Sequence, residues 1–371
     1  MIIGIDGNEA NVVSRVGSGQ YGFELLKAFH SDESGHQFEI FLKNPPVSDM
    51  PAVSPDWHYK VFGPKKFWTQ VALPLKLARN NHLDVFFSPS HYAPRFSRVP
   101  QVITIFDLSF LYFPQYFRKK DLGQLKRWTK YSALKSKAII TISENSKRDI
   151  VKEYKVDPKQ VFVTYPGYDK TRFKVQKESD IQKIKDKYSI PGDYIIFVGT
   201  LQPRKNIEKL IEAFVGIGST YPDLKLVIVG KKGWMFESIF ETVKRNKLGD
   251  KVIFTDFVPD DDTSFLIAGA RLYVLPSLYE GFGIPVVEAM ASGTPVAVSD
   301  VSSLPEVVGD AGLLFDPQDI GDIQKKCEKI LKDGQLSTQL SKKGIERAKK
   351  FNWAHTAAET IKVLESVGQS F

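Results

Sequence analysis

Short runs rich in β-branched and aromatic residues alternate with helical stretches along the whole chain, and this alternation constrains the fold more than any other feature. Parallel strands cannot be joined by a tight turn and need a crossover, which is usually a helix. Strands are expected at residues 2–6, 37–42, 83–89, 101–107 and 137–143, and again at 194–199, 224–230, 251–257, 271–277, 294–300 and 311–317. The expected fold class is therefore α/β, with parallel sheets between layers of helices.

The chain is long enough for about two domains, since 371 residues exceed an ordinary single core. The polar stretch 166–180 interrupts the alternation, so we place the domains at residues 1–175 and 176–371. The last helix, about residues 355–371, is a candidate for packing back on the first domain. In doubly wound sheets, ligands bind beyond the carboxyl ends of the strands. We expect the two domains to face each other across a cleft, with the functional residues in strand-to-helix loops.

The net charge of +8 is concentrated in the first half of the chain. Residues 1–175 hold 26 Lys and Arg against 16 Asp and Glu, whereas residues 176–371 hold 25 against 27. The stretch RKKDLGQLKRWTKYSALKSK, residues 118–137, has eight basic residues and one acidic residue. Such a basic amphipathic segment suits an anionic membrane surface or simply forms a solvated helix face. No nucleic-acid-binding motif is present, so nucleic acid is not an expected partner.

The single cysteine, Cys327, excludes a disulfide framework within the chain and favours a reducing compartment. No run of about 18 apolar residues is present, and the first residues resemble a strand more than a secretion signal. The expected location is the cytoplasm, at the inner face of the cell membrane.

Two glutamates flank a glycine-rich turn in LYEGFGIPVVEAMASGTP, residues 278–295. Gly281 and Gly283 allow backbone N–H groups to approach a ligand, and Pro285 suits the first turn of a helix. Glu288 is expected in that first turn and Glu280 in the preceding loop. Such carboxylates can accept hydrogen bonds from ligand hydroxyls while the helix N-terminus attracts an anion. The alternative is that Glu288 only stabilises the helix end and Glu280 is a surface residue.

Two cations occur where a helix is expected to begin, in VGTLQPRKN, residues 198–206. The helix dipole disfavours Arg204 and Lys205 there, but a bound diphosphate would reverse that penalty. Solvated surface charges are the alternative. The G-x-x-x-x-G-K-[ST] pattern is absent from the sequence, so this is not a P-loop.

The segment VGSGQYG, residues 16–22, has the G-x-G-x-x-G spacing of dinucleotide-binding turns. However, ten residues separate the first expected strand from Gly17, where a dinucleotide turn needs one or two. We interpret Gly17 and Gly19 as part of a flexible loop that approaches phosphate, with a plain tight turn as the alternative.

Three further polar residues follow expected strands of the first half. Asp107 is positioned to contact a hydroxyl or to cap a helix. His91 is a candidate for contact with the acceptor, and Ser143 is a second candidate, although serine at such a position often caps a helix. The histidines show no metal-ligand spacing, so no protein-bound metal and no cofactor are expected.

Taken together, these motifs resemble glycosyltransferase family 4, whose members have the GT-B fold of two Rossmann-like domains. The resemblance rests on EGFGIPVVEAMASGTPV (280–296), VGTLQPRKNIEKLIEAF (198–214), FDLSFLYFPQYF (106–117) and the ending FNWAHTAAETIKVL (351–364). It covers nearly the whole chain and is strongest over residues 194–317. The first half is similar to mannosyltransferases of bacterial surface-polysaccharide assembly.

The resemblance implies an N-terminal domain that binds the acceptor and a C-terminal domain that binds the nucleotide sugar. Glu288 would bind the ribose, and Glu280 would hold the transferred sugar together with the amides of Phe282 and Gly283. Arg204 and Lys205 would neutralise the departing diphosphate in place of a metal ion. The remaining donor contacts would be Gly17, Gly19, Thr200, Phe257, Val258, Gly281 and Ile284, with Phe257 and Val258 near the base. The residues implied in catalysis are Glu280, Asp107, Arg204 and Lys205.

One position departs from the family pattern, since Phe106 precedes Asp107 where relatives have histidine. Either His91 substitutes for that side chain, the backbone suffices, or the transferred sugar differs. The resemblance implies a retaining, metal-independent hexosyltransferase that uses a GDP- or UDP-hexose, with GDP-mannose favoured, and a lipid-linked or oligosaccharide acceptor. The alternatives are a sugar-nucleotide epimerase of similar shape, a non-catalytic sugar-binding protein and a dinucleotide oxidoreductase.

Overall fold

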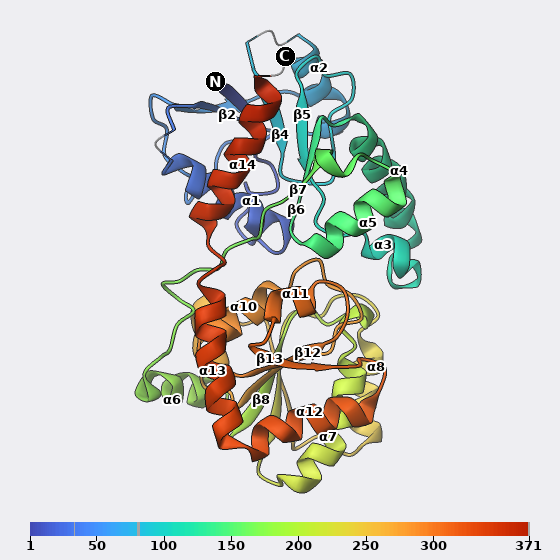
Figure 1. Cartoon of the computed structure of the whole chain (residues 1–371), viewed down its shortest axis with the longest axis vertical. Coiled ribbons are helices and arrows are strands. Elements are labelled where there is room, and N and C mark those ends of the chain that lie inside the picture. Colours follow the sequence, from blue (N-terminus) through green and yellow to red (C-terminus); the bar gives the residue numbers. More distant parts are fainter. Residues whose placement is uncertain (33, 80–81, 370–371) are drawn as a thin grey trace. The chain divides into compact units, whose positions relative to one another are not determined.

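A computed structural model of the chain describes residues 1–32, 34–79 and 82–369, which form two compact units. The first unit contains Met1–Gly167 and the segment from Asn352 onward, and the second contains Tyr168–Phe351 (Figure 1). The boundary therefore follows Gly167 instead of residue 175. Residues after Gly167 belong to the second unit because Arg172 forms ion pairs there with Asp260 and Asp261. Residues 370 and 371 of the expected last helix lie outside the described residues.

The first unit is built on a seven-stranded, all-parallel sheet with the strand order β3-β2-β1-β4-β5-β6-β7. Its strands are β1 (Ile2–Asp6), β2 (Gln37–Leu42), β3 (Trp57–Val61), β4 (Val85–Ser88), β5 (Gln101–Thr104), β6 (Ala138–Thr141) and β7 (Val161–Val163). The helices are α1 (Ser18–His30), α2 (Leu73–Ala78), α3 (Ser109–Tyr112), α4 (Lys119–Lys135), α5 (Glu144–Tyr154) and α14 (Trp353–Gly368). Shorter helical turns are the π-helical η1 (Trp68–Ala72) and the 3-10 turns η2 (Pro114–Tyr116) and η3 (Pro158–Gln160).

The second unit has a six-stranded parallel sheet with the order β10-β9-β8-β11-β12-β13. Its strands are β8 (Tyr194–Val198), β9 (Lys225–Val229), β10 (Val252–Asp256), β11 (Leu272–Leu275), β12 (Val296–Ser299) and β13 (Gly312–Phe315). The helical elements are α6 (Glu178–Lys187), η4 (Pro203–Lys205), α7 (Ile207–Thr220), α8 (Glu237–Arg245), α9 (Asp260–Ala268), α10 (Ile284–Ala291), α11 (Leu304–Val308), α12 (Ile320–Lys332) and α13 (Gly334–Ala348).

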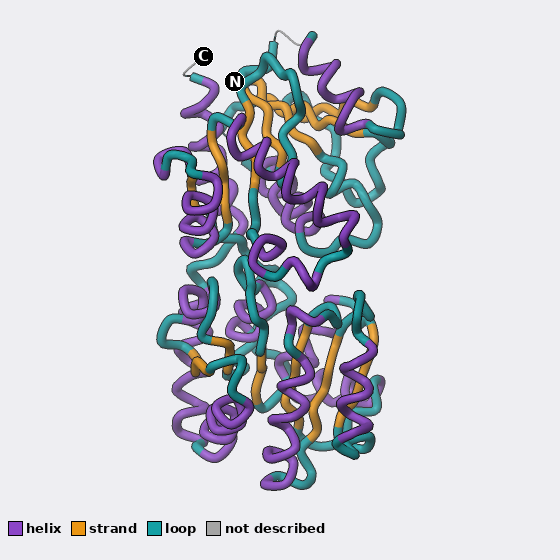
Figure 2. Tube along the Cα trace, turned by 90° about the vertical axis from the view of Figure 1, so that its right-hand side faces the viewer, coloured by secondary structure: helices purple, strands orange, loops and turns teal. Residues whose placement is uncertain are grey.

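Both sheets are buried on both faces, because helices cover each side, as Figure 2 shows within each unit. The inner strands are accordingly continuous apolar runs instead of alternating ones. Ile3, Ile5 and Ile40 of the first unit and Ile195 and Val227 of the second are fully buried. The prediction of an α/β fold with two parallel sheets is confirmed.

Two strands of the first sheet were not predicted. β3 and β7 lie at the two edges of the sheet, so their side chains are only partly covered. β3 reads WHYKV, and β7 has three residues, which leaves no apolar run to detect.

The last helix, α14, belongs to the first unit and packs against α1 and β4. The Trp353 ring meets the edge of Tyr21 at 5.6 Å between centroids, and the Thr356 hydroxyl donates to the Tyr165 carbonyl at 2.6 Å. Across the described residues, none of the helices is both long enough and apolar enough to cross a membrane.

Candidate active site

Two cations and one carboxylate meet beyond the ends of two neighbouring strands of the second unit. Arg204 and Lys205 lie in η4, which follows β8, and Glu280 follows β11. Lys205 Nζ lies 2.5 Å from Glu280 Oε1, and Arg204 Nη1 lies 3.2 Å from Oε2. The Ser277 hydroxyl also donates to Oε1 at 2.6 Å. Both carboxylate oxygens of Glu280 are therefore held by protein donors.

The electrostatics of this cluster keep Glu280 ionised. Burial alone would raise the pKa of Glu280, which is 7% exposed. The positive charges of Lys205 and Arg204 and the hydrogen bonds from Lys205 and Ser277 outweigh burial and bring the pKa to about 2. The three charges sum to one net positive charge, which suits an anionic ligand.

The loop around Glu280 is fixed by its backbone as well. The Glu280 amide donates to the Ser302 hydroxyl at 2.9 Å, and the Ser303 hydroxyl donates to the carbonyls of Glu280 and Phe282. Arg204 Nη1 also donates to the Tyr279 carbonyl. Glu280 was predicted to hold the transferred sugar, but its carboxylate contacts the cations in this structure.

Glu288 lies one turn deeper in its helix than predicted. Gly283 caps α10 in a left-handed conformation with φ of 105°, so the helix begins at Ile284 and Glu288 is its fifth residue. A side chain at Gly283 would be strained there, and its Cβ would lie 2.9 Å from Leu304 Cδ2. The placement of Glu288 in the first turn is therefore wrong, and so is the proposed stabilisation of the helix end by its charge.

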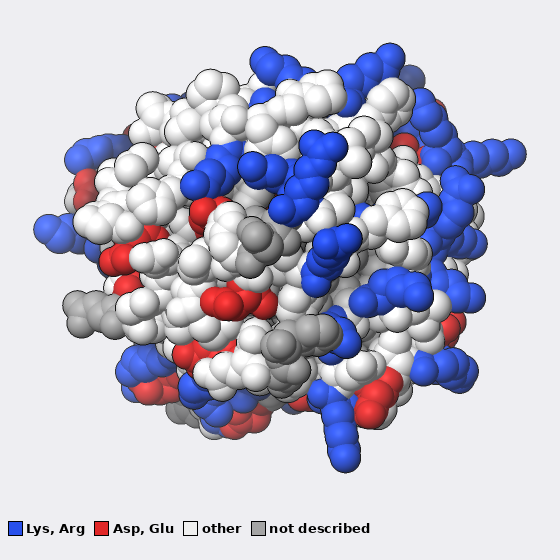
Figure 3. All heavy atoms as spheres, turned by 90° about the horizontal axis from the view of Figure 1, so that it is seen from above, with Lys and Arg blue, Asp and Glu red and all other residues white. Residues whose placement is uncertain are grey.

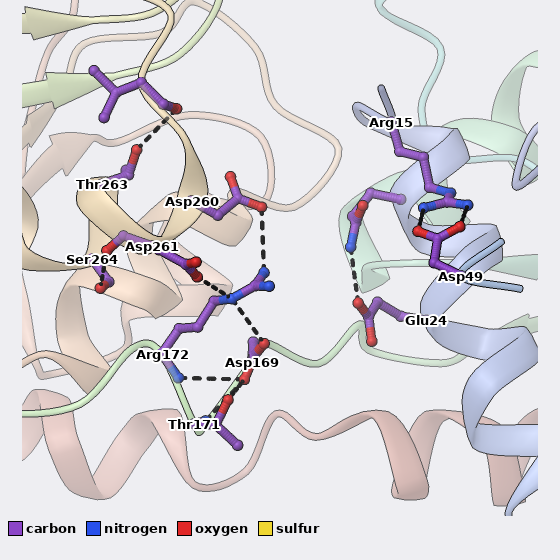
Figure 4. Close-up of polar contacts among 12 residues, drawn as sticks. Arg15, Glu24, Asp49, Asp169, Thr171, Arg172, Asp260, Asp261, Thr263 and Ser264 are labelled. Carbon is purple, nitrogen blue, oxygen red and sulfur yellow. Dashed lines mark hydrogen bonds and ion pairs between the residues drawn. The ribbon is translucent and has the colours of Figure 1, made fainter. Parts of the chain in front are cut away.

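Charged residues of the second unit act on Glu288, and Figure 4 shows them grouped around Arg172. Arg172 pairs with Asp261 at 2.7 Å, Asp169 at 3.5 Å and Asp260 at 3.7 Å. Burial raises the pKa of Glu288, the negative charges of Asp260 and Asp169 add to this, and Arg172 opposes it, giving a pKa of about 8. At neutral pH, Glu288 is therefore largely protonated. Its carboxyl group has no hydrogen-bond partner among the residues that the structure describes, so it can both donate to and accept from a ligand.

This raised pKa predicts a pH-dependent stability. The folded chain holds the Glu288 proton more tightly than the unfolded chain, whose ordinary pKa is near 4.5. The stabilisation is complete below that value and is lost as the pH rises through about 8. Between pH 5.5 and 8.5 we expect Glu288→Gln to remove about 3 kcal/mol of this pH-dependent loss. Urea unfolding at both pH values measures it.

The matched control is Glu237→Gln, which removes a charge from an exposed position at the start of α8. The control should follow the parent chain at both pH values. A pH dependence of stability that is identical in the parent and in Glu288→Gln would contradict the raised pKa.

The start of α10 offers donors for an anion. The backbone N–H groups of Gly281, Gly283 and Ile284 have no acceptor among the described residues, and the first N–H groups of any helix lack an internal partner. Phe282 is buried and packs its ring against Phe351. The turn thus presents backbone donors above a closed apolar core.

The predicted base-binding residues lie beside β10. Phe257 is 55% exposed, and Lys231 Nζ lies 4.8 Å from the centre of its ring. A bulge in β10 and a left-handed Asp256, with φ of 55°, project Phe257 outward, whereas Val258 turns inward and is buried. Thr200 is half-buried in the loop that follows β8.

In the first unit, the glycine pattern does not form one flexible loop. Gly17 caps α1 with φ of 52° and is exposed, whereas Gly19 and Gly22 lie inside the helix. A Cβ at Gly19 would lie 2.8 Å from the Glu9 carbonyl oxygen, so close packing requires this glycine. The preceding Arg15 pairs with Asp49 and stacks on Phe23 at 3.7 Å, which fixes the loop (Figure 4).

His91, Phe106 and Asp107 come together beyond the ends of β4 and β5. The His91 ring lies 5.5 Å from the Phe106 ring, and its buried Nδ1 has no hydrogen-bond partner in the described part of the chain. Burial lowers the pKa of His91 against the charges of Asp107 and Glu9. Asp107 Oδ1 accepts from the amide of Ser109, the first residue of α3, at 2.8 Å. The neutral imidazole of His91 therefore lies next to the place that a histidine side chain at position 106 would occupy.

Ser143 is not positioned to meet an acceptor. It is fully buried, and its hydroxyl caps α5 by accepting from the Ser146 amide at 3.0 Å. The capping alternative explains this residue.

Four contributors to the site were missed in the sequence: Ser277, Ser302, Arg172 and Lys231. Ser277 and Ser302 follow strands, as the predicted residues do, so their position was a usable signal. Arg172 lies in the polar stretch interpreted as a linker. Across the described residues, the structure contains no group of three or more His, Cys, Asp and Glu side chains arranged to hold a metal ion.

Comparisons with known proteins agree with this geometry. The family described as Glycosyl transferases group 1 matches residues 180–347, and Glycosyltransferase Family 4 matches residues 17–172. O-antigen chain mannosyltransferase B of Escherichia coli is 32% identical over 283 residues, which cover 75% of this chain and 73% of that protein. The chain belongs to glycosyltransferase family 4.

Solved structures place this family 4 glycosyltransferase in the GT-B fold. Sucrose-phosphate synthase of Thermosynechococcus elongatus superposes with a TM-score of 0.78 at 21% identity, covering 100% of both chains. Anabaena Alr3699/HepE in complex with UDP and glucose gives 0.77 at 18% identity, covering 98% of this chain and 99% of that one. The prediction of a glycosyltransferase with two Rossmann-like domains is confirmed over the epimerase, sugar-binding and oxidoreductase alternatives.

Proposed function

We propose that this glycosyltransferase moves mannose from a nucleotide-sugar donor to a lipid-linked saccharide during cell-surface polysaccharide synthesis, with retention of configuration and without a metal ion. The single observation that carries the proposal is the cluster of Arg204, Lys205 and Glu280 beyond the strands of the second unit. The similarity to an O-antigen mannosyltransferase supports mannose as the sugar.

The cation cluster suits a departing diphosphate. When the bond from the sugar C1 to the phosphate oxygen breaks, negative charge grows on that oxygen. Arg204 and Lys205 are already held in place by Glu280, so they stabilise this charge without first reorganising. Arginine can form two hydrogen bonds to phosphate, and lysine adds a point charge. The N–H groups at the start of α10 add to this field.

Glu288 and Phe257 suit the nucleoside. A protonated Glu288 both donates and accepts, which complements the two neighbouring hydroxyls of a ribose. The exposed Phe257 ring offers a face on which a base can stack, with Lys231 on the ring. A purine covers more of such a ring than a pyrimidine, which agrees with GDP as the favoured nucleotide.

Retention requires little acid–base chemistry from the protein. Glu280 is paired with two cations and is therefore a poor nucleophile. In the proposed step the acceptor oxygen attacks C1 on the face that the diphosphate leaves. The C1–phosphate bond breaks, the C1–acceptor bond forms, and the acceptor proton passes to the departing phosphate oxygen. His91 and Asp107 of the first unit would orient the reacting hydroxyls.

The basic face of the first unit suits an anionic membrane surface. Lys and Arg greatly outnumber Asp and Glu on the face in Figure 3 and gather on its right-hand side. Lys119, Lys126 and Lys130 of α4 are all exposed. Anionic lipids attract such groups, so we place the enzyme at the inner leaflet, where a lipid-linked acceptor lies.

The test is competitive binding of nucleotides followed by transfer. We expect GDP to raise the Tm of the chain more than UDP or ADP, and GDP-mannose to give nucleotide release only with a lipid-linked acceptor. Glu288→Leu should weaken GDP binding about tenfold, because an apolar side chain can neither donate to nor accept from the ribose hydroxyls. Calorimetry at pH 7 measures the affinity.

Glu237→Gln on the surface of α8 again serves as the control and should bind GDP as the parent does. The Anabaena structure holds UDP and glucose. A larger response to UDP and turnover of UDP-glucose would therefore overturn the choice of GDP-mannose. Conversion of the donor sugar with no acceptor present would overturn the transferase itself.

A further inference from the structure

A cavity of about 510 Å³ lies in the first unit, and among its lining residues is Tyr92, whose ring lies 6.4 Å from the ring of His91. It is lined by the loop that follows β4, the turn η1 and helix α4. Its volume is typical of a site for a small molecule. The cavity belongs entirely to the first unit and has no part in the donor cluster.

Two arginines give the cavity a positive charge. Arg95 and Arg127 both line it, and no acidic residue is among its described lining residues. Neither arginine forms an ion pair with the described residues. Arg95 lies 4.7 Å from the centre of the Tyr131 ring, which holds the guanidinium over the cavity wall. Two unpaired guanidinium groups facing one cavity favour a phosphate or diphosphate.

Three aromatic side chains give the same cavity an apolar surface in addition to its positive charge. Tyr92, Trp128 and Tyr131 line it, and Tyr92 meets Trp128 edge to face at 5.3 Å. The wall is fixed because the Ala93 amide donates to the buried Ser132 hydroxyl at 2.8 Å. Such rings offer faces for the C–H side of a sugar or for an apolar chain.

Two phenylalanines beside the cavity are held outward in an unfavourable backbone conformation. Phe96, in the cavity wall, has φ of 59° and is 82% exposed. Phe67 caps η1, whose residues Thr69 and Gln70 line the cavity, and it has φ of 57° and is 62% exposed. Left-handed backbone is rare for large side chains and is associated with functional sites, as are π-helical turns. The rim of the charged cavity is thus strongly apolar.

We infer that this cavity binds the lipid-linked diphosphate of the acceptor. Arg95 and Arg127 hold the diphosphate, Tyr92 and Trp128 contact the first sugar, and Phe67 and Phe96 contact the start of the lipid chain. The inference rests on the proposed function and assigns the acceptor a second point of attachment on the enzyme. A free oligosaccharide would use neither the arginines nor the exposed phenylalanines.

Geranyl diphosphate is the probe for this site. It is titrated by calorimetry into the full chain, with excess GDP and UDP present so that Arg204 and Lys205 are occupied. We expect Arg95→Gln/Arg127→Gln to weaken its binding at least tenfold. The matched control, Lys126→Gln/Lys130→Gln, removes the same charge from exposed positions of α4 outside the cavity and should change the affinity less than twofold.

Two further arms separate the possible sources of the phosphate. Inorganic diphosphate should bind at least tenfold more weakly than geranyl diphosphate, and Phe96→Ser should weaken geranyl diphosphate alone. Binding of the chain to vesicles that contain phosphatidylglycerol should depend more on Lys126 and Lys130 than on Arg95 and Arg127. The site would be overturned if Lys126→Gln/Lys130→Gln lost as much affinity for geranyl diphosphate as Arg95→Gln/Arg127→Gln. It would also be overturned if Arg95→Gln/Arg127→Gln bound geranyl diphosphate as the parent does. Loss of vesicle binding alone in the arginine pair would also overturn it.

The same preparations keep this inference separate from the proposed function. GDP binding is measured for each variant, and it should be unchanged in Arg95→Gln/Arg127→Gln, which also shows that the variant is folded. A parent chain that binds geranyl diphosphate through these arginines but never turns over a nucleotide sugar would overturn the transferase proposal alone.

Discussion

Lys205→Ala is expected to lower the rate of sugar transfer about a thousandfold. Removing one fixed donor from a developing negative charge commonly costs 10² to 10³ in turnover, and Lys205 supplies a full charge in a half-buried position. The loss should fall on turnover more than on the apparent affinity for the donor, since the charge on the phosphate oxygen grows as the bond breaks. Single-turnover transfer with a saturating donor measures it.

The same substitution should destabilise the chain. Among the described residues, the buried Glu280 would keep only Arg204 and Ser277 as side-chain partners, so we expect a loss of about 3 kcal/mol in the free energy of unfolding. Lys209→Ala is the matched control. Lys209 lies in α7, the helix that follows η4, and makes an exposed hydrogen bond to the Gln318 carbonyl. It should change turnover less than twofold. A Lys205→Ala variant with near-normal turnover would contradict the diphosphate role of the cluster.

Glu280→Gln should separate binding from turnover. The neutral amide adds one net positive charge to the cluster and cannot hold Arg204 and Lys205 together. We expect nucleoside diphosphate to bind at least as tightly as before, while turnover falls about a hundredfold because the cations lose their fixed geometry. Calorimetry with GDP and single-turnover transfer measure the two effects on one preparation.

Ser277→Ala is the graded control for this prediction. It removes one hydrogen bond from Glu280 Oε1 and leaves both ion pairs, so we expect about a tenfold fall in turnover. Glu288→Leu should behave in the opposite way, with weaker GDP binding and a smaller change in turnover. If Glu280→Gln weakens GDP binding as much as Glu288→Leu does, the two glutamates do not have separate roles.

The second unit was easier to predict than the first, for a physical reason. The inner strands of its sheet are buried on both faces and are therefore written as apolar runs, such as YIIFV in β8 and LYVL in β11. The edge strands β3 and β7 of the first unit lack such runs. The boundary at Gly167 could not be located from composition, because the ion pairs of Arg172 decide it.

The residues of the site were predictable, but their contacts were not. Residues that follow parallel strands meet at one edge of the sheet, which brings Arg204, Lys205 and Glu280 together. The ion pairs of Glu280 with both cations could not be predicted, because they depend on side-chain geometry across two loops. The depth of Glu288 in α10 depends on where Gly283 ends the loop, and its raised pKa comes from Asp169 and Asp260, which are distant in sequence.

The return of α14 to the first unit has a consequence for the order in which the protein can be made. The ring of Tyr21 packs against Trp353, and the strand that ends near Tyr165 is tied to Thr356, so these contacts span the entire second unit. A ribosome delivers every residue of the second unit before it delivers α14. The first unit, although it begins the chain, is therefore the last to receive all of its parts, and until then the surface that α14 covers stays open.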